Sequence, residues 1–290
     1  MNELYPFESC YLEINGFRLH YLDEGHGDPV VMLHGNPTWS FFYRNLVLSF
    51  RESHRMIAPD HIGCGLSDKP DDEAYNYRLE QRIEDLEAFL DQLGIGSNIT
   101  LVLHDWGGMI GMGYAVRHPD RIRRIVVLNT SAFHLPKTKP LPWQIWLGRN
   151  TKFGEFLILR LNAFCRGAAR MCASSYSMSK RVKEGYLHPY GSVNDRIGIL
   201  RFVQDIPLKP GDPSFDAVTS IEEGLEKLKE KPMLICWGDR DFVFDMNFLQ
   251  EWRNRFPGAT VHRFHHAGHY VLEDAQDEIV SVLDVFLKKT

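Results

Sequence analysis

Residues 101–109 have the sequence LVLHDWGGM, which predicts a strand that turns directly into a helix. The apolar segment 99–103 is typical of a buried strand, and two glycines lead into the apolar helical segment 109–116. Such a sharp turn raises one side chain above the edge of a sheet, where it can serve as a nucleophile. Asp105 holds that position, and its carboxylate can attack an electrophilic carbon and form an ester. An aspartate here could also simply cap the helix, so the turn alone leaves both interpretations open.

On both sides of this turn, short apolar segments alternate with helical ones. Strands are expected at 10–15, 18–23, 29–33, 55–58, 99–103, 125–128, 233–237 and 260–264. Helices are expected at 42–50, 79–93, 109–116, 246–256 and 270–287. Strands and helices that alternate along a chain predict a mostly parallel sheet with helices on both faces.

The alternation stops after Thr130. Residues 131–214 lack buried β-branched runs and contain seven prolines, which favours several short helices. We therefore expect a discontinuous core formed by 1–130 and 215–290, with 131–214 inserted as a helical cap. Ligands of parallel sheets bind beyond the carboxyl ends of the strands, so the cap is expected to cover the site.

Composition excludes several classes of protein. The 290 residues carry a net charge of −5, and no apolar run approaches the ~18–20 residues that span a bilayer. The N-terminus has no apolar segment typical of a secretory signal. Five scattered cysteines without a CxxC motif indicate free thiols, so a cytoplasmic location is expected. The acidic net charge and the absence of a recognition motif argue against nucleic acid as a partner.

The net charge is unevenly distributed along the chain. Residues 131–210 hold thirteen basic and four acidic side chains, a net +9, and the remainder carries −14. A basic, apolar segment at 153–172 would suit self-association, contact with an acidic partner, or peripheral contact with a membrane. The alternative is a well-solvated cap with no partner.

Two segments near the C-terminus supply possible partners for Asp105. His269 follows a predicted strand and precedes the last helix, as a catalytic base does when the order is nucleophile, acid, histidine. Asp239 and Asp241 both lie just beyond the strand 233–237, and either could orient His269. The neighbouring His265 and His266 suggest a metal site, but Gly268 interrupts any helix and no acidic metal-binding motif accompanies them, so no metal is expected. No cofactor is expected either, because the glycines match no nucleotide-binding motif.

The segment 32–40, MLHGNPTWS, follows the first buried strand and adds hydrogen-bond donors. In a fold of this kind, backbone N–H groups of this segment and of the residue after the nucleophile, Trp106, stabilise an oxyanion. The side chains of Asn36 and Trp106 also carry N–H donors that could hold an anion leaving from carbon.

Five segments together resemble the haloalkane dehalogenase family of α/β-hydrolases: HGNPTWS (34–40), APDHIGCGLSDKP (58–70), HDWGG (104–108), GDRDFVF (238–244) and AGHYVLED (267–274). The resemblance runs along nearly the whole chain. It implies a mostly parallel, eight-stranded sheet flanked by helices, with Asp105 as nucleophile, His269 as base, and Asn36 and Trp106 as the halide-binding pair. Since 128–131 contain no carboxylate, it assigns the acid to Asp241, as in the third dehalogenase subfamily. A haloalkane would yield an alcohol and a halide ion through a covalent ester.

The stretches 129–139 and 201–212 also resemble the β-lactone decarboxylases of bacterial long-chain olefin synthesis. That resemblance implies the same nucleophile, with a long-chain β-lactone giving a cis-olefin and CO2. Epoxide hydrolases fit less well, because they use two cap tyrosines that cannot be assigned among Tyr176, Tyr186 and Tyr190. A binding or scaffold protein without activity is a further alternative, although all three triad positions are filled.

Overall fold

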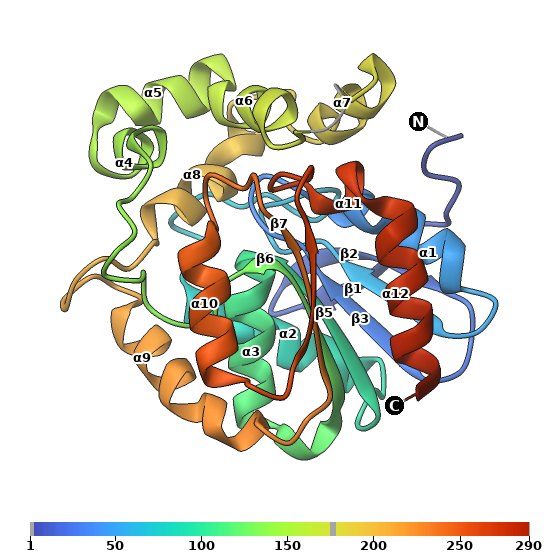
Figure 1. Ribbon diagram of the computed structural model, residues 1–290. Helices are drawn as coiled ribbons and strands as arrows, with labels where there is room; N and C mark the ends of the chain where they lie inside the picture. The colour runs from blue at the N-terminus through green and yellow to red at the C-terminus, as the bar shows by residue number, and fades with distance from the viewer. Residues whose placement is uncertain (1–2, 175–177, 290) are drawn as a thin grey trace.

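The computed structural model describes residues 3–174 and 178–289 (Figure 1). At its centre lies an eight-stranded sheet in the order β1-β2-β4-β3-β5-β6-β7-β8. Its strands are β1 (Cys10–Ile14), β2 (Phe17–Glu24), β3 (Pro29–Leu33), β4 (Arg55–Pro59), β5 (Ile99–Asp105), β6 (Ile122–Thr130), β7 (Met233–Gly238) and β8 (Thr260–Phe264). Within this sheet only β2 runs against its neighbours, so the predicted mostly parallel arrangement is confirmed.

Helices cover both faces of the sheet, as the alternating sequence predicts. Figure 1 shows α1 (Arg44–Phe50) and α12 (Gln276–Lys289) on one face, and α2 (Leu79–Gln92), α3 (Trp106–Arg117), α9 (Phe215–Gly224) and α10 (Met246–Arg255) on the other. Every residue of β5 is buried, because neighbouring strands and helices surround this central strand. The candidate nucleophile therefore stands on a rigid part of the molecule.

In the described residues after β6 lie the short helices α4 (Trp143–Asn150), α5 (Lys152–Leu161), α6 (Ala163–Met171), α7 (Lys180–Leu187) and α8 (Ile197–Gln204). In Figure 1 they lie above the carboxyl ends of the strands, where a cap is expected. We refer to them as the cap helices. The division of the chain into a core and a separate cap at 131–214 stays a prediction.

The structure alters several predicted boundaries. The helix expected at 270–287 is two helices, α11 (Val271–Asp274) and α12, separated by Ala275. The helix expected at 109–116 begins three residues earlier, because the backbone turns at Asp105 without an intervening loop. The helix expected at 42–50 starts as a 3-10 turn over Ser40–Tyr43 before α1.

Two further observations concern composition. None of the helices within the described ranges is long and apolar enough to cross a bilayer. All five cysteines are free, and four of them are buried. The cytoplasmic location expected from these thiols stays a prediction.

Candidate active site

The turn after β5 holds Asp105 in an unusual backbone conformation. Its φ of 52° and ψ of −124° lie in a region that L-residues rarely adopt. The turn can be this tight because Gly107 and Gly35 lack side chains. A Cβ on Gly107 would overlap the carbonyl oxygen of Leu33, and one on Gly35 would overlap the Asp105 carboxylate. The sequence therefore places a strained aspartate against the end of β3.

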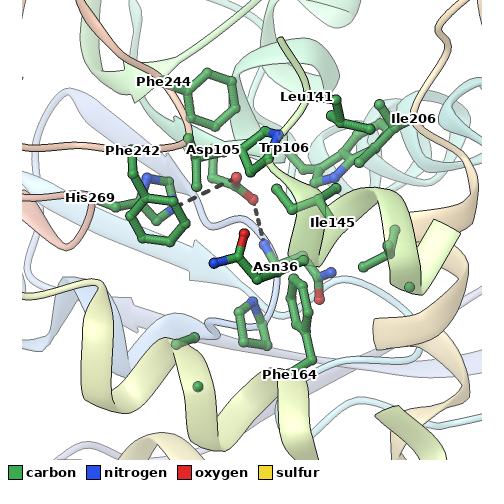
Figure 2. A pocket seen from close by; sticks show the side chains of 18 of the residues that line it. Asn36, Asp105, Trp106, Leu141, Ile145, Phe164, Ile206, Phe242, Phe244 and His269 are labelled. Atoms are coloured by element: carbon green, nitrogen blue, oxygen red, sulfur yellow. Dashed lines mark hydrogen bonds and ion pairs between the residues drawn. The ribbon is translucent and has the colours of Figure 1, made fainter. Parts of the chain in front are cut away.

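Backbone donors stabilise this carboxylate. The Asn36 N–H donates to Oδ1 of Asp105 at 2.6 Å, and the Trp106 N–H also stabilises the carboxylate. These are the two backbone groups that the sequence predicts for an oxyanion site. Oδ2 faces His269 instead (Figure 2).

His269 and Asp241 meet at the same edge of the sheet. The Nδ1–H of His269 donates to Oδ2 of Asp241 at 2.8 Å, and both side chains are almost completely buried. Asp241 is held in turn by the backbone N–H groups of Val243 and Phe244. Asp241 thus has the position of an orienting acid.

Asp239, the other candidate acid, points elsewhere. Its carboxylate pairs with Arg263 at 2.8 Å and with His265, and it does not contact His269. His266 contacts Glu278 at 3.2 Å, so the three neighbouring histidines have different partners. Over residues 3–174 and 178–289, no group of three or more potential ligands could hold a metal ion.

Burial and charge shift the pKa values of the central pair. Burial raises the pKa of Asp105 above its usual value, although His269 and the two backbone N–H groups oppose the rise. Burial alone would lower the pKa of His269, but the charge and hydrogen bond of Asp241, together with the charge of Asp105, raise it. The histidine is therefore held toward its charged form beside the candidate nucleophile.

The side chains of Asn36 and Trp106 lie at the floor of the same cavity (Figure 2). One amide N–H of Asn36 donates to the carbonyl oxygen of Ile199 at 3.1 Å, which leaves a second amide N–H. The Trp106 ring packs against Phe202 with centroids 5.2 Å apart, and its indole N–H makes no hydrogen bond to another described residue. Both groups can therefore donate to a ligand beside Asp105.

A cavity of about 300 Å³ lies above these groups. Its walls come from the cap helices, the segment 133–148 and the segment 242–244, and they are mostly apolar. The Phe244 ring stacks on His269 with centroids 5.7 Å apart, whereas Leu141, Ile145, Ile206 and Phe164 lie on the cap side in Figure 2. Among the described lining residues Asp105 is the one carboxylate, and there is no lysine or arginine. Such a cavity suits a small apolar molecule with one reactive polar centre.

Two residues that support the site were not among those predicted from the sequence. Asn129, at the end of β6, donates its amide N–H to Asp241 at 3.0 Å and so helps to hold the acid. His104 donates from Nε2 to the carbonyl oxygen of His269 at 2.9 Å, and burial lowers its pKa well below the usual value. Their positions near the carboxyl ends of predicted strands could have indicated that both residues lie close to the site.

The cap tyrosines do not form an acid pair in the cavity. Tyr186 donates its hydroxyl to Glu273, and Tyr190 donates to the carbonyl oxygen of Thr38; neither lines the cavity. Tyr176 lies outside the described residues.

Comparisons with known proteins identify the fold family and related enzymes. A family model described as alpha/beta hydrolase fold matches residues 28–276. A cis-3-alkyl-4-alkyloxetan-2-one decarboxylase of Shewanella oneidensis is 55% identical over 290 residues, which cover 100% of this chain and 91% of that protein. Haloalkane dehalogenase 2 of Mycobacterium bovis is 30% identical, over 97% of this chain and 95% of its own. The crystal structure of the haloalkane dehalogenase DatA from Agrobacterium tumefaciens C58 superposes with a TM-score of 0.87 at 25% identity, over 97% of this chain and 96% of that one.

Proposed function

The chain belongs to the α/β-hydrolase fold family, in the group that contains haloalkane dehalogenases and oxetan-2-one decarboxylases, and from this premise we propose that it is a β-lactone decarboxylase. Its substrate is a cis-3,4-dialkyloxetan-2-one, and its products are a cis-alkene and CO2. The observation that carries the proposal is the 55% identity to a decarboxylase over the whole chain, against 30% to a dehalogenase. The sequence motifs place dehalogenation first. The relatives found by comparison fit both activities, and the higher identity to the decarboxylase is our reason for placing it first here.

In the first step, Oδ2 of Asp105 attacks ring carbon C4 from the side opposite the ring oxygen. The C4–O bond breaks, its electron pair stays on the ring oxygen, and the lactone becomes an ester of Asp105 with a free carboxylate on C3. Oδ1 remains held by the Asn36 N–H. The amide of Asn36 and the indole of Trp106 face the carboxylate as its charge develops.

In the second step, the bond between C3 and the carboxylate breaks and CO2 leaves. Its electron pair forms the C3=C4 double bond, and the C4–O bond to Asp105 breaks, which restores the carboxylate. Attack from the back places the new C–O bond anti to the C3–carboxylate bond. Elimination in that arrangement keeps both alkyl groups on the same side, so a cis lactone gives a cis-alkene without rotation. No water and no proton take part.

His269 has an electrostatic role in this route. Its imidazolium lies beside Asp105 and stabilises the carboxylate that leaves in the second step. Asp241 keeps the ring oriented and charged. The apolar walls favour the loss of CO2, since the substrate carboxylate is poorly solvated among them.

Haloalkane dehalogenation is the second candidate, and the two side-chain N–H donors beside Asp105 favour it. Asp105 displaces a halide ion, which Asn36 and Trp106 hold. His269 then takes a proton from water, and the water attacks the ester carbonyl while backbone N–H groups hold the oxyanion. An alcohol leaves and Asp105 is restored.

One experiment separates the two activities. The purified protein is incubated with a cis-dialkyl β-lactone and with a 1-bromoalkane at equal enzyme concentration, and alkene and bromide are measured. We expect alkene from the lactone at a far higher rate than bromide from the bromoalkane. The reverse order would overturn the proposal in favour of dehalogenation. No product from either substrate would favour the scaffold alternative.

A further inference from the structure

Large apolar side chains are exposed on three consecutive cap helices. Of the eleven such side chains found in the described residues, six lie on α4, α5 and α6: Trp143, Trp146, Phe153, Phe156, Leu161 and Met171. Trp143 is 70% exposed and Phe153 is 61% exposed. This concentration is unusual for a surface that only contacts water.

The exposed residues share faces of their helices. On α5, Phe153, Phe156 and Arg160 are three and four residues apart and therefore point the same way. On α4, Trp143 and Trp146 are three residues apart, and both are more than half exposed. Figure 1 shows α5 and α6 along the side of the cap that faces away from the sheet.

Basic side chains accompany these apolar ones. Lys152, Arg160, Arg166 and Arg170 are exposed on α5 and α6. None of the four has an ion-pair or hydrogen-bond partner among the described side chains. Glu155 is the one acidic residue between 143 and 172. We call the six apolar and four basic residues together the outer cap surface.

This surface is continuous with the entrance of the cavity. Trp143 and Met171 belong to the outer cap surface and also line the cavity above Asp105. Phe242, also partly exposed, lines the cavity from the segment after β7. An apolar molecule bound at the outer cap surface could therefore enter the cavity directly.

We propose that the outer cap surface docks on an anionic lipid bilayer. Tryptophan and phenylalanine prefer the boundary between headgroups and acyl chains, and unpaired arginines and lysines are attracted to anionic headgroups. A second copy of the chain is a poorer occupant, because a symmetric contact would bring two basic surfaces together. The cavity then takes its long-chain lactone from the bilayer. That delivery step rests on the proposed function, whereas the docking itself does not.

The test is sedimentation of the full chain with vesicles of phosphatidylcholine, with and without phosphatidylglycerol. Binding is expected with phosphatidylglycerol only, and it should fall as salt is raised. Arg160→Gln/Arg166→Gln should weaken binding roughly 25-fold, about fivefold for each charge removed. Arg253→Gln/Lys289→Gln, the same charge change outside the cap helices, should leave binding unchanged.

Fluorescence gives a second readout. Of the six tryptophans only Trp143 and Trp146 are exposed, so a blue shift of the emission on vesicle binding reports on the outer cap surface. Trp146→Phe should reduce that shift while binding persists.

Equal binding to neutral vesicles, or no effect of the arginine double variant, would overturn the proposal. Self-association that depends on protein concentration, without vesicle binding, would assign the surface to a second copy instead. Failure of the docking proposal can be distinguished from failure of the proposed function. A protein that converts a short, soluble lactone but does not bind vesicles loses the docking proposal only, and one that binds but forms no alkene loses the proposed function only.

Discussion

Nε2 of His269 lies 3.6 Å from Oδ2 of Asp105, too far for a hydrogen bond but close enough for a strong charge interaction. The oxygen that would attack the substrate thus accepts no hydrogen bond from His269, while the imidazole beside it has a pKa that Asp241 and Asp105 raise despite burial. The same geometry serves two chemistries. In the decarboxylase route His269 acts only through its charge, whereas in the dehalogenase route it must accept a proton from water.

His269→Ala should therefore have different effects on the two substrates. With the β-lactone we expect continued turnover at a rate lowered roughly 10²-fold, because only electrostatic stabilisation is lost. With a bromoalkane we expect one bromide per protein and a stable alkyl adduct on Asp105, since no group activates water. Mass spectrometry of the intact protein and its peptides distinguishes the two results.

Asp105→Asn is the matched control for that variant, since it keeps the shape of the side chain and should abolish both reactions. Accumulation of a stable lactone-derived adduct in His269→Ala would contradict the electrostatic role.

The pH dependence should also separate the routes. Burial raises the pKa of Asp105 above 3.8. As the pH is lowered, both reactions should therefore be lost at a higher pH than they would be with an aspartate of ordinary pKa. The pKa of His269 is raised above 6.5, despite burial, by Asp241 and Asp105. Alkene formation needs the charged imidazole and should decline as the pH rises through that pKa, whereas release of alcohol from the ester needs the neutral imidazole and should increase. Initial rates against pH for both substrates test this, and a rise of alkene formation as the pH passes through the pKa of His269 would refute it.

The sequence was sufficient for the elements that depend on local pattern. The strand and glycines around Asp105 predicted the turn, because only glycine fits where Gly107 approaches Leu33. Local pattern could not decide whether Asp239 or Asp241 orients His269, since both follow β7. The direction of each side chain depends on tertiary contacts, with Arg263 for Asp239 and with His269 for Asp241. The support from Asn129 and His104 depends on which strands are neighbours, which local pattern does not reveal.

Because Asp241 contacts His269 and Asp239 contacts Arg263, substitutions of the two aspartates test the role of the orienting acid against a matched control. Asp241→Asn removes the charge that raises the pKa of His269, and we expect alkene formation at neutral pH to fall by at least about tenfold. Asp239→Asn removes a surface pair with Arg263 and should change the rate less than about twofold. Steady-state rates of the two variants check this, and an equal loss in both would exclude Asp241 as the orienting acid.

Trp106→Phe tests the anion-binding donors. Phenylalanine keeps an aromatic ring against Phe202 but lacks the indole N–H. We expect a fall of roughly 10²-fold in kcat with either substrate, with stability changed little, because the donor acts where negative charge develops. Thermal unfolding is the control. An unchanged kcat would mean that the indole only fills space.

Substitution of Gly167 should change both the stability of the fold and the preference for substrate chain length. It lies inside α6, where glycine costs about 1 kcal/mol relative to alanine, and it lines the cavity. An added Cβ would meet only the Met171 side chain, at 3.4 Å, so a larger side chain has room to extend along the cavity wall. Gly167→Leu should therefore stabilise the fold by up to about 1 kcal/mol and raise KM for long-chain lactones about tenfold or more, while short-chain lactones react as before. Urea unfolding and a series of lactones of increasing chain length measure the two effects. Equal losses at every chain length would show that Gly167 serves the helix rather than the space for an alkyl chain.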